Sequence, residues 1–188
     1  MAFSYYQKRV KHTLNHDRNN VIYWSIFLFA FLLMSRKSNL VPVSSRRFDK
    51  SRQLCRGDVQ EFPNYLLVHF RWTKTIQFGN RTLIIPLLAM PSSNFCPVRA
   101  YHNMCNLNPG SPTSPAFVVN VNGNTCALNY VQFQRKLKSL IHEIGLDPNL
   151  FSSHSFRRGE LLLLIKLAFH QILFKLWVTG KVMHTKNT

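Results

Sequence analysis

The amino-acid sequence predicts an α+β domain that is mainly helical and carries a small antiparallel sheet. Three stretches lead to this prediction. Residues 21–34 form an apolar run with the length of a helix, residues 65–75 and 82–88 have strand composition around a turn, and residues 128–144 repeat apolar side chains at helical spacing. The chain has 188 residues, of which 46% are hydrophobic and 13% aromatic, which is enough to bury one core.

The N-terminal part divides into a basic lead-in, residues 1–20, and an apolar run, residues 21–34 (VIYWSIFLFAFLLM). A membrane span needs about 20 apolar residues, and this run stops at Arg36 and Lys37. We therefore expect a helix buried inside the protein, with a membrane anchor as the alternative. Residues 35–42 end that helix or begin the next one, and Pro42 limits its extension.

The predicted hairpin carries a lysine on an apolar face. Alternate residues of a strand point to the same side, so Leu66, Val68, Phe70, Trp72 and Lys74 share one face. A lysine on an apolar strand face is less well explained as a surface residue than as a site residue. We therefore treat Lys74, just before the turn, as a candidate site residue, with a twisted, solvated hairpin end as the alternative.

The remaining elements follow from local signals. Residues 97–105 predict a short helix with Pro97 in its first turn, and residues 108–115 predict a surface loop. Residues 116–121 predict a short strand, followed by a turn at residues 122–124. Residues 128–144 predict an amphipathic helix that packs on the core and ends at Gly145.

The charge balance indicates a polyanionic partner. Lys+Arg number 24 and Asp+Glu 7, so the formal net charge is +17, and the excess is spread along the chain. Residues 44–56 hold five basic residues, and we expect them to form a loop near a bound phosphate. The acidic residues are few and mostly far apart, which argues against a nuclease built on carboxylate-bound metal ions.

The cysteines, Cys55, Cys96, Cys105 and Cys126, form no Cys-x-x-Cys pair, and we interpret them as reduced packing residues. A metal site made from Cys96, His102 and Cys105 is the alternative, although no fourth ligand is evident.

The clearest chemical signal lies in residues 152–159. His154 and Arg157 are three positions apart and share one face of a predicted helix start, which Ser152 or Ser153 can cap. A guanidinium that grips two oxygens, an imidazole that donates to a third and the positive end of a helix dipole together suit a bound phosphate. The alternative is an exposed basic helix start.

These residues together resemble the catalytic domain of tyrosine recombinases, nearest the transposon-borne eukaryotic kind found in Crypton and DIRS-type elements. The resemblance covers residues 21–159. It rests on the order and spacing of three motifs: Arg36-Lys37-Ser38-Asn39-Leu40-Val41-Pro42 after the apolar helix, Trp72-Thr73-Lys74-Thr75 with Gln77-Phe78-Gly79, and His154-Ser155-Phe156-Arg157-Arg158-Gly159.

The resemblance implies a recombinase-like fold and a role for each matching residue. Arg36 and Arg157 would clamp the scissile phosphate, Lys74 would be the general acid, and His154 would assist proton transfer. The family uses neither a metal ion nor another cofactor. The implied partner is double-stranded DNA in the nucleus, with a possible homo-oligomer on the DNA, and neither a small-molecule substrate nor a membrane is expected.

Residues 160–188 break the resemblance, because the family continues with a Gly-Asp-Trp or Gly-His element and a nucleophilic tyrosine, whereas this segment contains no tyrosine. If the codons are read one nucleotide earlier from Gly159, Trp177 followed by Val178 dictates glycine. With permitted bases elsewhere, the shifted reading can be GATFAYKAGVPSDFIQVMGDWKSDAYKKY, which is the missing family ending. We therefore expect residues 160–188 to be an out-of-frame tail, with a genuine apolar helix as the alternative.

The sequence thus predicts a basic lead-in (1–20), a recombinase catalytic-like domain (21–159) and an aberrant tail (160–188). The predicted function is DNA binding by a domain of the DNA recombination and integration machinery, catalytically inactive as translated because the nucleophile is missing. A small basic membrane-associated protein with no enzymatic role is the alternative, and it rests on the two apolar stretches.

Overall fold

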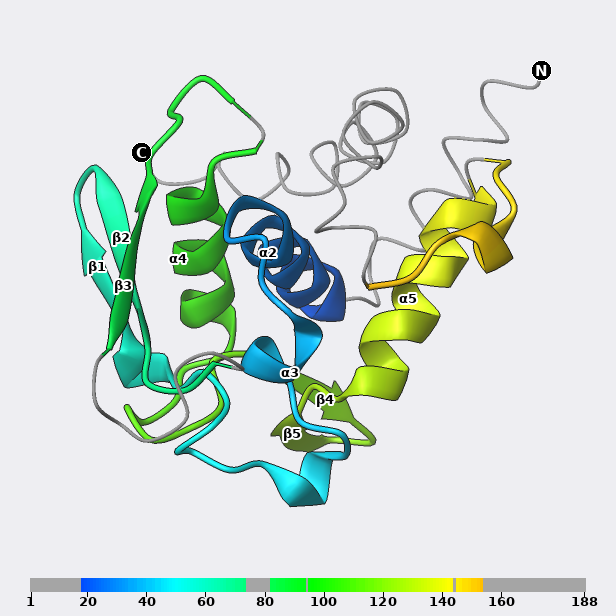
Figure 1. The fold of residues 1–188 in the computed structure, drawn as a ribbon, viewed down its shortest axis with the longest axis horizontal. Helices are drawn as coiled ribbons and strands as arrows, with labels where there is room; N and C mark the ends of the chain where they lie inside the picture. The colour runs from blue at the N-terminus through cyan, green and yellow to red at the C-terminus, as the bar shows by residue number, and fades with distance from the viewer. Residues whose placement is uncertain (1–17, 74–81, 94, 144, 154–188) are drawn as a thin grey trace, which may run out of the picture.

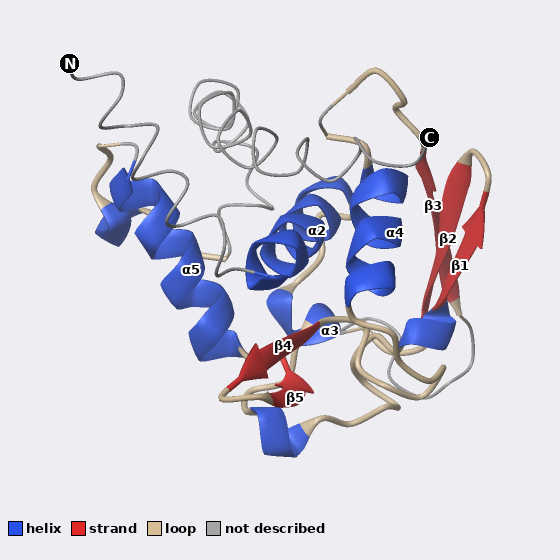
Figure 2. Cartoon of the chain, turned by 180° about the vertical axis from the view of Figure 1, so that it is seen from behind, coloured by secondary structure: helices blue, strands red, loops and turns tan. Residues whose placement is uncertain are grey.

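The protein has an α+β fold, as the sequence predicts, and the computed structural model describes residues 18–73, 82–93, 95–143 and 145–153. A three-stranded antiparallel sheet, helix α4 (Pro97–Leu107), helix α2 (Arg18–Leu32) and helix α5 (Tyr130–Glu143) follow one another across the molecule (Figure 1). Figure 2 shows the same order from behind, with the two-stranded sheet β4–β5 at the lower end. Every strand pair in the described part of the chain is antiparallel.

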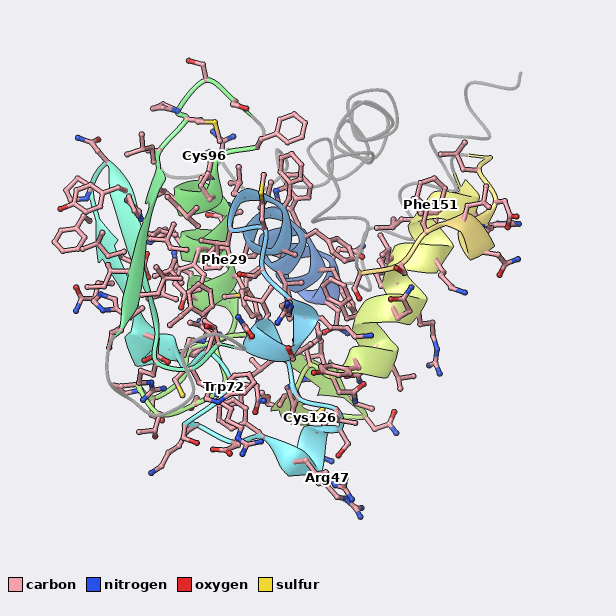
Figure 3. The ribbon with its side chains drawn as sticks, in the orientation of Figure 1. Phe29, Arg47, Trp72, Cys96, Cys126 and Phe151 are labelled. Atoms are coloured by element: carbon pink, nitrogen blue, oxygen red, sulfur yellow. The ribbon has the colours of Figure 1, made fainter. Side chains whose placement is uncertain are left out.

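Helix α2 is the buried helix that the apolar run predicts. Its side chains Ile22, Ile26, Leu28 and Phe29 are fully buried, and they belong to the core of the domain. Phe29 lies between α2 and α4 (Figure 3), where its ring stacks on Tyr101 at a centroid distance of 5.3 Å. No helix in the described ranges combines the length and the apolar character of a membrane span.

The predicted hairpin forms the centre and one edge of the larger sheet. Strand β2 (Tyr65–Phe70) pairs with β3 (Leu83–Leu88), and Leu66, Val68 and Phe70 are buried, so the predicted inward face is confirmed up to Phe70. The sequence analysis missed β1 (Val59–Phe62), which pairs with β2 from Val59↔Val68 to Phe62↔Tyr65. Most of β1 is exposed, so it lacks the alternation of apolar residues that marks a half-buried strand.

The second half of the domain follows its local signals closely. Helix α4 has Pro97 at its first position, and α5 buries Phe133, Leu137, Leu140 and Ile141, as the helical spacing predicts. Val131, which the same spacing assigns to the buried face, is exposed instead. Gly145 after α5 has φ +81, which suits a glycine at a helix end.

The predicted short strand, β4 (Val118–Val121), has an unpredicted partner in β5 (Asn124–Ala127). Asn122 and Gly123 between them have φ 51 and φ 80, the positive values of a tight hairpin turn. The sequence analysis assigned Asn124 to the turn, whereas the structure places it at the start of β5.

Candidate functional site

The candidate site begins at the junction where α2 ends and the short helix α3 (Lys37–Leu40) starts. Met34 adopts φ 47, its amide donates to the carbonyl of Phe31 at 3.1 Å, and the Ser35 amide donates to that of Ala30 at 3.2 Å. These are the two hydrogen bonds of a Schellman helix end, with methionine in the position that glycine usually takes. The chain therefore turns sharply at a defined point just before Arg36.

Arg36 is held from both sides by this turn and by α3. It is the N-cap of α3, with φ −69 and ψ 141, and its carbonyl accepts the Asn39 amide at 2.9 Å. The residue is half-buried, because Ser35 before it and Leu40 after it are buried. The backbone of Arg36 is thus well anchored while its side chain retains access to solvent.

Helix α3 rests on the start of α5. The Lys37 ammonium lies over the Tyr130 ring at 4.9 Å from its centroid, and the Tyr130 amide donates to the carbonyl of Pro42 at 3.0 Å. Burial raises the pKa of Tyr130, an effect that a hydrogen bond with the Ser38 side chain opposes. The Tyr130 phenol therefore stays protonated at neutral pH.

Residues 49–54 connect α3 to the end of β2. The Leu54 amide donates to the carbonyl of Asn39 at 3.0 Å, which ties this segment to α3. On its other side the Arg52 guanidinium lies 5.7 Å from the centroid of the Trp72 ring, and Arg71 Nη2 donates to the carbonyl of Lys50 at 2.6 Å. A small hollow lies along this contact, lined by Ser51, Arg52, Gln53, Leu54, Asp58, His69, Phe70, Arg71 and Trp72.

The structure describes one of the four candidate site residues, Arg36. Lys74, His154 and Arg157 lie outside the described residues, so whether all four cations meet at one phosphate stays a prediction. Residues close to them in the sequence are described. Trp72, two positions before Lys74, lies against Arg52 in the segment that is bonded to α3. The amide of Ser153, just before His154, donates to Gln134 Oε1 on α5 at 3.3 Å.

Each carboxylate in the described part of the chain is engaged elsewhere. Asp49 accepts from Ser51 and forms an ion pair with Arg52, Asp58 accepts from Arg71, Glu61 lies 3.3 Å from His102, Glu143 accepts from Ser139, and Asp147 caps a short turn. Within the same ranges no carboxylate pairs with Arg36. Its charge is therefore not neutralised by these acids and is available for an anion.

Arg56 departs from the expectation that the basic residues of 44–56 form a loop near phosphate. Its side chain is buried, and its Nη1 and Nη2 donate to Cys105 Sγ at 2.6 Å and to the carbonyl of Asn108 at 2.8 Å. Both partners lie about fifty positions further along the chain, so no local sequence pattern indicates the contact. Arg56 is a structural residue that anchors the end of α4.

An ion pair that the sequence analysis missed lies beside it. Arg71 Nη2 and Asp58 Oδ2 are 2.6 Å apart, and the same oxygen accepts the Cys55 amide at 2.8 Å. Asp58 is nearly buried, and its position three residues after Cys55 matches a capping box. The spacing between Cys55 and Asp58 could be seen in the sequence, but it did not identify Arg71 as the partner of Asp58.

The four cysteines are free thiols. Cys55 and Cys96 are buried, and burial raises the pKa of the Cys55 and Cys105 thiols. Cys96 accepts the Met90 amide, whereas His102 faces Glu61. No group of three or more metal-binding side chains lies together among the residues described.

No protein-family model matches this chain, and neither does a curated protein or a solved structure. The chemistry must therefore be argued from the residues themselves. The junction offers an arginine whose backbone is anchored and whose guanidinium has no carboxylate partner in the described structure, beside a lysine that lies over an aromatic ring. Such a group can bind phosphate oxygens in a bidentate manner.

Proposed function

We propose that this chain is a duplex-DNA-binding domain of the tyrosine-recombinase type, which as translated cannot cut or rejoin strands. The observation that carries the proposal is the state of Arg36, whose backbone is anchored between two helices while no described carboxylate neutralises its charge. The net charge of +17 makes a polyanion the natural partner for it.

The elements that lead into the three motifs support the proposal. The apolar helix leads into Arg36, β2 leads toward Lys74 with its apolar face inward, and α5 leads through a buried Phe151 toward His154. Residues 49–54 contact both α3 and Trp72, which relates the first two of these regions in space.

The chemistry explains why DNA would be bound but not cleaved. In the proposed site Arg36 and Arg157 hold the non-bridging oxygens of a phosphodiester, Lys74 donates a proton to the leaving oxygen, and His154 assists. Strand cleavage also requires a tyrosine oxygen that attacks phosphorus and forms a phosphotyrosyl ester. Residues 160–188 contain no tyrosine, so the reaction stops at binding.

Binding is tested with a fluorescently labelled duplex titrated with the full chain between 50 and 200 mM salt, concentrations over which counterion release is readily seen as a loss of affinity. We expect the logarithm of the affinity to fall linearly with the logarithm of the salt concentration, with a slope of about −0.9 for each phosphate contacted. A chain that fails to bind duplex at the lowest salt, or that prefers anionic lipid vesicles to duplex, would refute the proposal.

The missing nucleophile is tested by restoring the reading frame. A chain in which residues 160–188 are replaced by the shifted reading should form a covalent adduct with nicked or suicide-substrate DNA, resistant to boiling in detergent. Changing the restored tyrosines to phenylalanine is the matched control and should abolish the adduct. Sequencing the underlying DNA provides the independent check, since a neighbouring frame without that ending removes the basis for the frameshift.

A further inference from the structure

Residues Ser45–Arg47 form a single 3-10 turn, η1, which we name the arginine turn. Arg46 and Arg47 are both exposed, and Arg47 projects from the lower end of the molecule in Figure 3. The turn packs against β5, whereas Arg36 lies at the junction of α2 and α3.

The arginine turn is anchored by its first residue. Ser45 Oγ donates to the carbonyl of Ala127 at 2.7 Å and accepts from Asn129 Nδ2 at 3.0 Å. Asn129 is itself fixed by reciprocal bonds with Gln132, at 3.0 and 3.1 Å, at the start of α5. Without such contacts an exposed turn would be free to move. The network therefore orders the backbone that carries the two adjacent arginines.

The two arginines carry charge that the described protein does not neutralise. None of the carboxylates in the described ranges contacts Arg46 or Arg47. Asp49, the closest in sequence, is bonded to the amide and hydroxyl of Ser51 and lies 3.6 Å from Arg52. The hydrogen bonds from Ser51 lower the pKa of Asp49, so this carboxylate stays ionised but is directed to other partners.

The other cations of the same loop are used differently. Arg52 pairs with Asp49 and lies over Trp72, while Arg56 is buried against Cys105. The basic stretch of residues 44–56 therefore separates into structural arginines at its C-terminal end and unpaired arginines in the turn. The unpaired arginines, Arg46 and Arg47, belong to the turn that Ser45 anchors.

We propose that the arginine turn contacts the sugar–phosphate backbone of duplex DNA at a second position, separate from the phosphate assigned to Arg36. The inference rests on the proposed function, because it takes duplex DNA as the ligand. One guanidinium group can donate two parallel hydrogen bonds to two oxygens of a phosphate. A turn whose backbone is already ordered loses less conformational entropy on binding. Backbone contacts of this kind orient a protein on the duplex without reading its sequence.

The experiment compares salt dependence in the full chain and its variants, with the same labelled duplex. Replacing both Arg46 and Arg47 with alanine should make the slope of log affinity against log salt shallower by about 1.8, twice the value of 0.9 for one phosphate. The matched control is Arg99→Ala, because Arg99 is exposed and donates to the carbonyls of Pro91 and Ser93. It lies in the first turn of α4, close to Cys96, which Figure 3 labels at the end of the molecule opposite Arg47.

A third variant tests the anchor without changing the charge. Ser45→Ala removes the bond to Ala127 and should leave the slope unchanged while lowering affinity about threefold, because the turn must then be ordered on binding. Circular dichroism spectra that match wild type show that the variants retain the fold. Ser45→Ala binding as tightly as wild type would overturn the role assigned to the anchor.

The outcomes separate this inference from the proposed function. If the wild-type chain binds duplex and the double variant shows the same salt slope, the second contact is overturned while DNA binding stands. A loss of slope in Arg99→Ala of about 0.9, half that of the double variant, also overturns it, since the effect would then follow the number of charges removed and not their position. A wild-type chain that does not bind duplex overturns the proposed function itself.

Discussion

Replacing Phe29 with alanine tests whether the apolar run is the core of a folded domain. Phe29 is completely buried and lies against two aromatic rings, stacked on Tyr101 and edge-on to Phe117 at a centroid distance of 5.4 Å. Losing its transfer free energy, about 1.5–3 kcal/mol, together with the ring contacts and the cavity left behind, should lower the free energy of unfolding by about 3–5 kcal/mol. That is a large part of the roughly 5–15 kcal/mol that stabilises a typical domain.

The measurement is urea unfolding followed by far-ultraviolet circular dichroism, with Phe29→Leu as a milder variant. Leucine retains most of the apolar volume, so its cost should be about 1–2 kcal/mol, and this variant should unfold at a measurably lower urea concentration. The control is Leu150→Ala, because Leu150 is 76% exposed, and it should change stability by less than about 0.5 kcal/mol. If Phe29→Ala unfolds at the same urea concentration as wild type, α2 does not form the core described above.

Three further predictions concern the site and the buried polar groups. Arg36→Ala should make the salt slope of duplex binding shallower by about 0.9 and leave the urea midpoint unchanged; a variant that unfolds early would instead mark Arg36 as structural. Asp58→Ala leaves the buried Cys55 amide without its acceptor and should cost about 1–3 kcal/mol in urea unfolding, whereas a cost near zero would show that the pair with Arg71 adds nothing. Burial raises the pKa of the Cys55 thiol above its ordinary 9.0 and that of the Tyr101 phenol above 10.0. The folded state therefore retains protons that the unfolded state releases, and stability should fall as the pH rises above about 9. Tyr101→Phe should make this fall less steep between pH 9 and 11, and an unchanged pH profile would contradict the argument.

Local sequence signals predicted the elements that depend on a single periodic face. Helix α5 was predictable because Phe133, Leu137 and Ile141 recur at helical spacing, and β2 because residues 65–75 have strand composition and lead into a turn. Strand β1 was not predictable in this way, because a mostly exposed strand owes its existence to its partner β2. The hairpin of β4 and β5 was only half predicted, although Asn122-Gly123 is a strong turn signal.

The sequence by itself determined that α2 would be a buried helix, that the domain would mix helices with antiparallel strands, and that Arg36 would follow directly on the apolar run. Only the tertiary structure decided what each arginine of residues 44–56 does. Arg56 is buried on Cys105 and Arg52 lies over Trp72, while Arg46 and Arg47 remain unpaired in the described structure on a turn that Ser45 attaches to Ala127. The physical reason is that these contacts join residues 20 to 82 positions apart, and a side chain's charge carries no information about which distant partner the folded chain will bring to it.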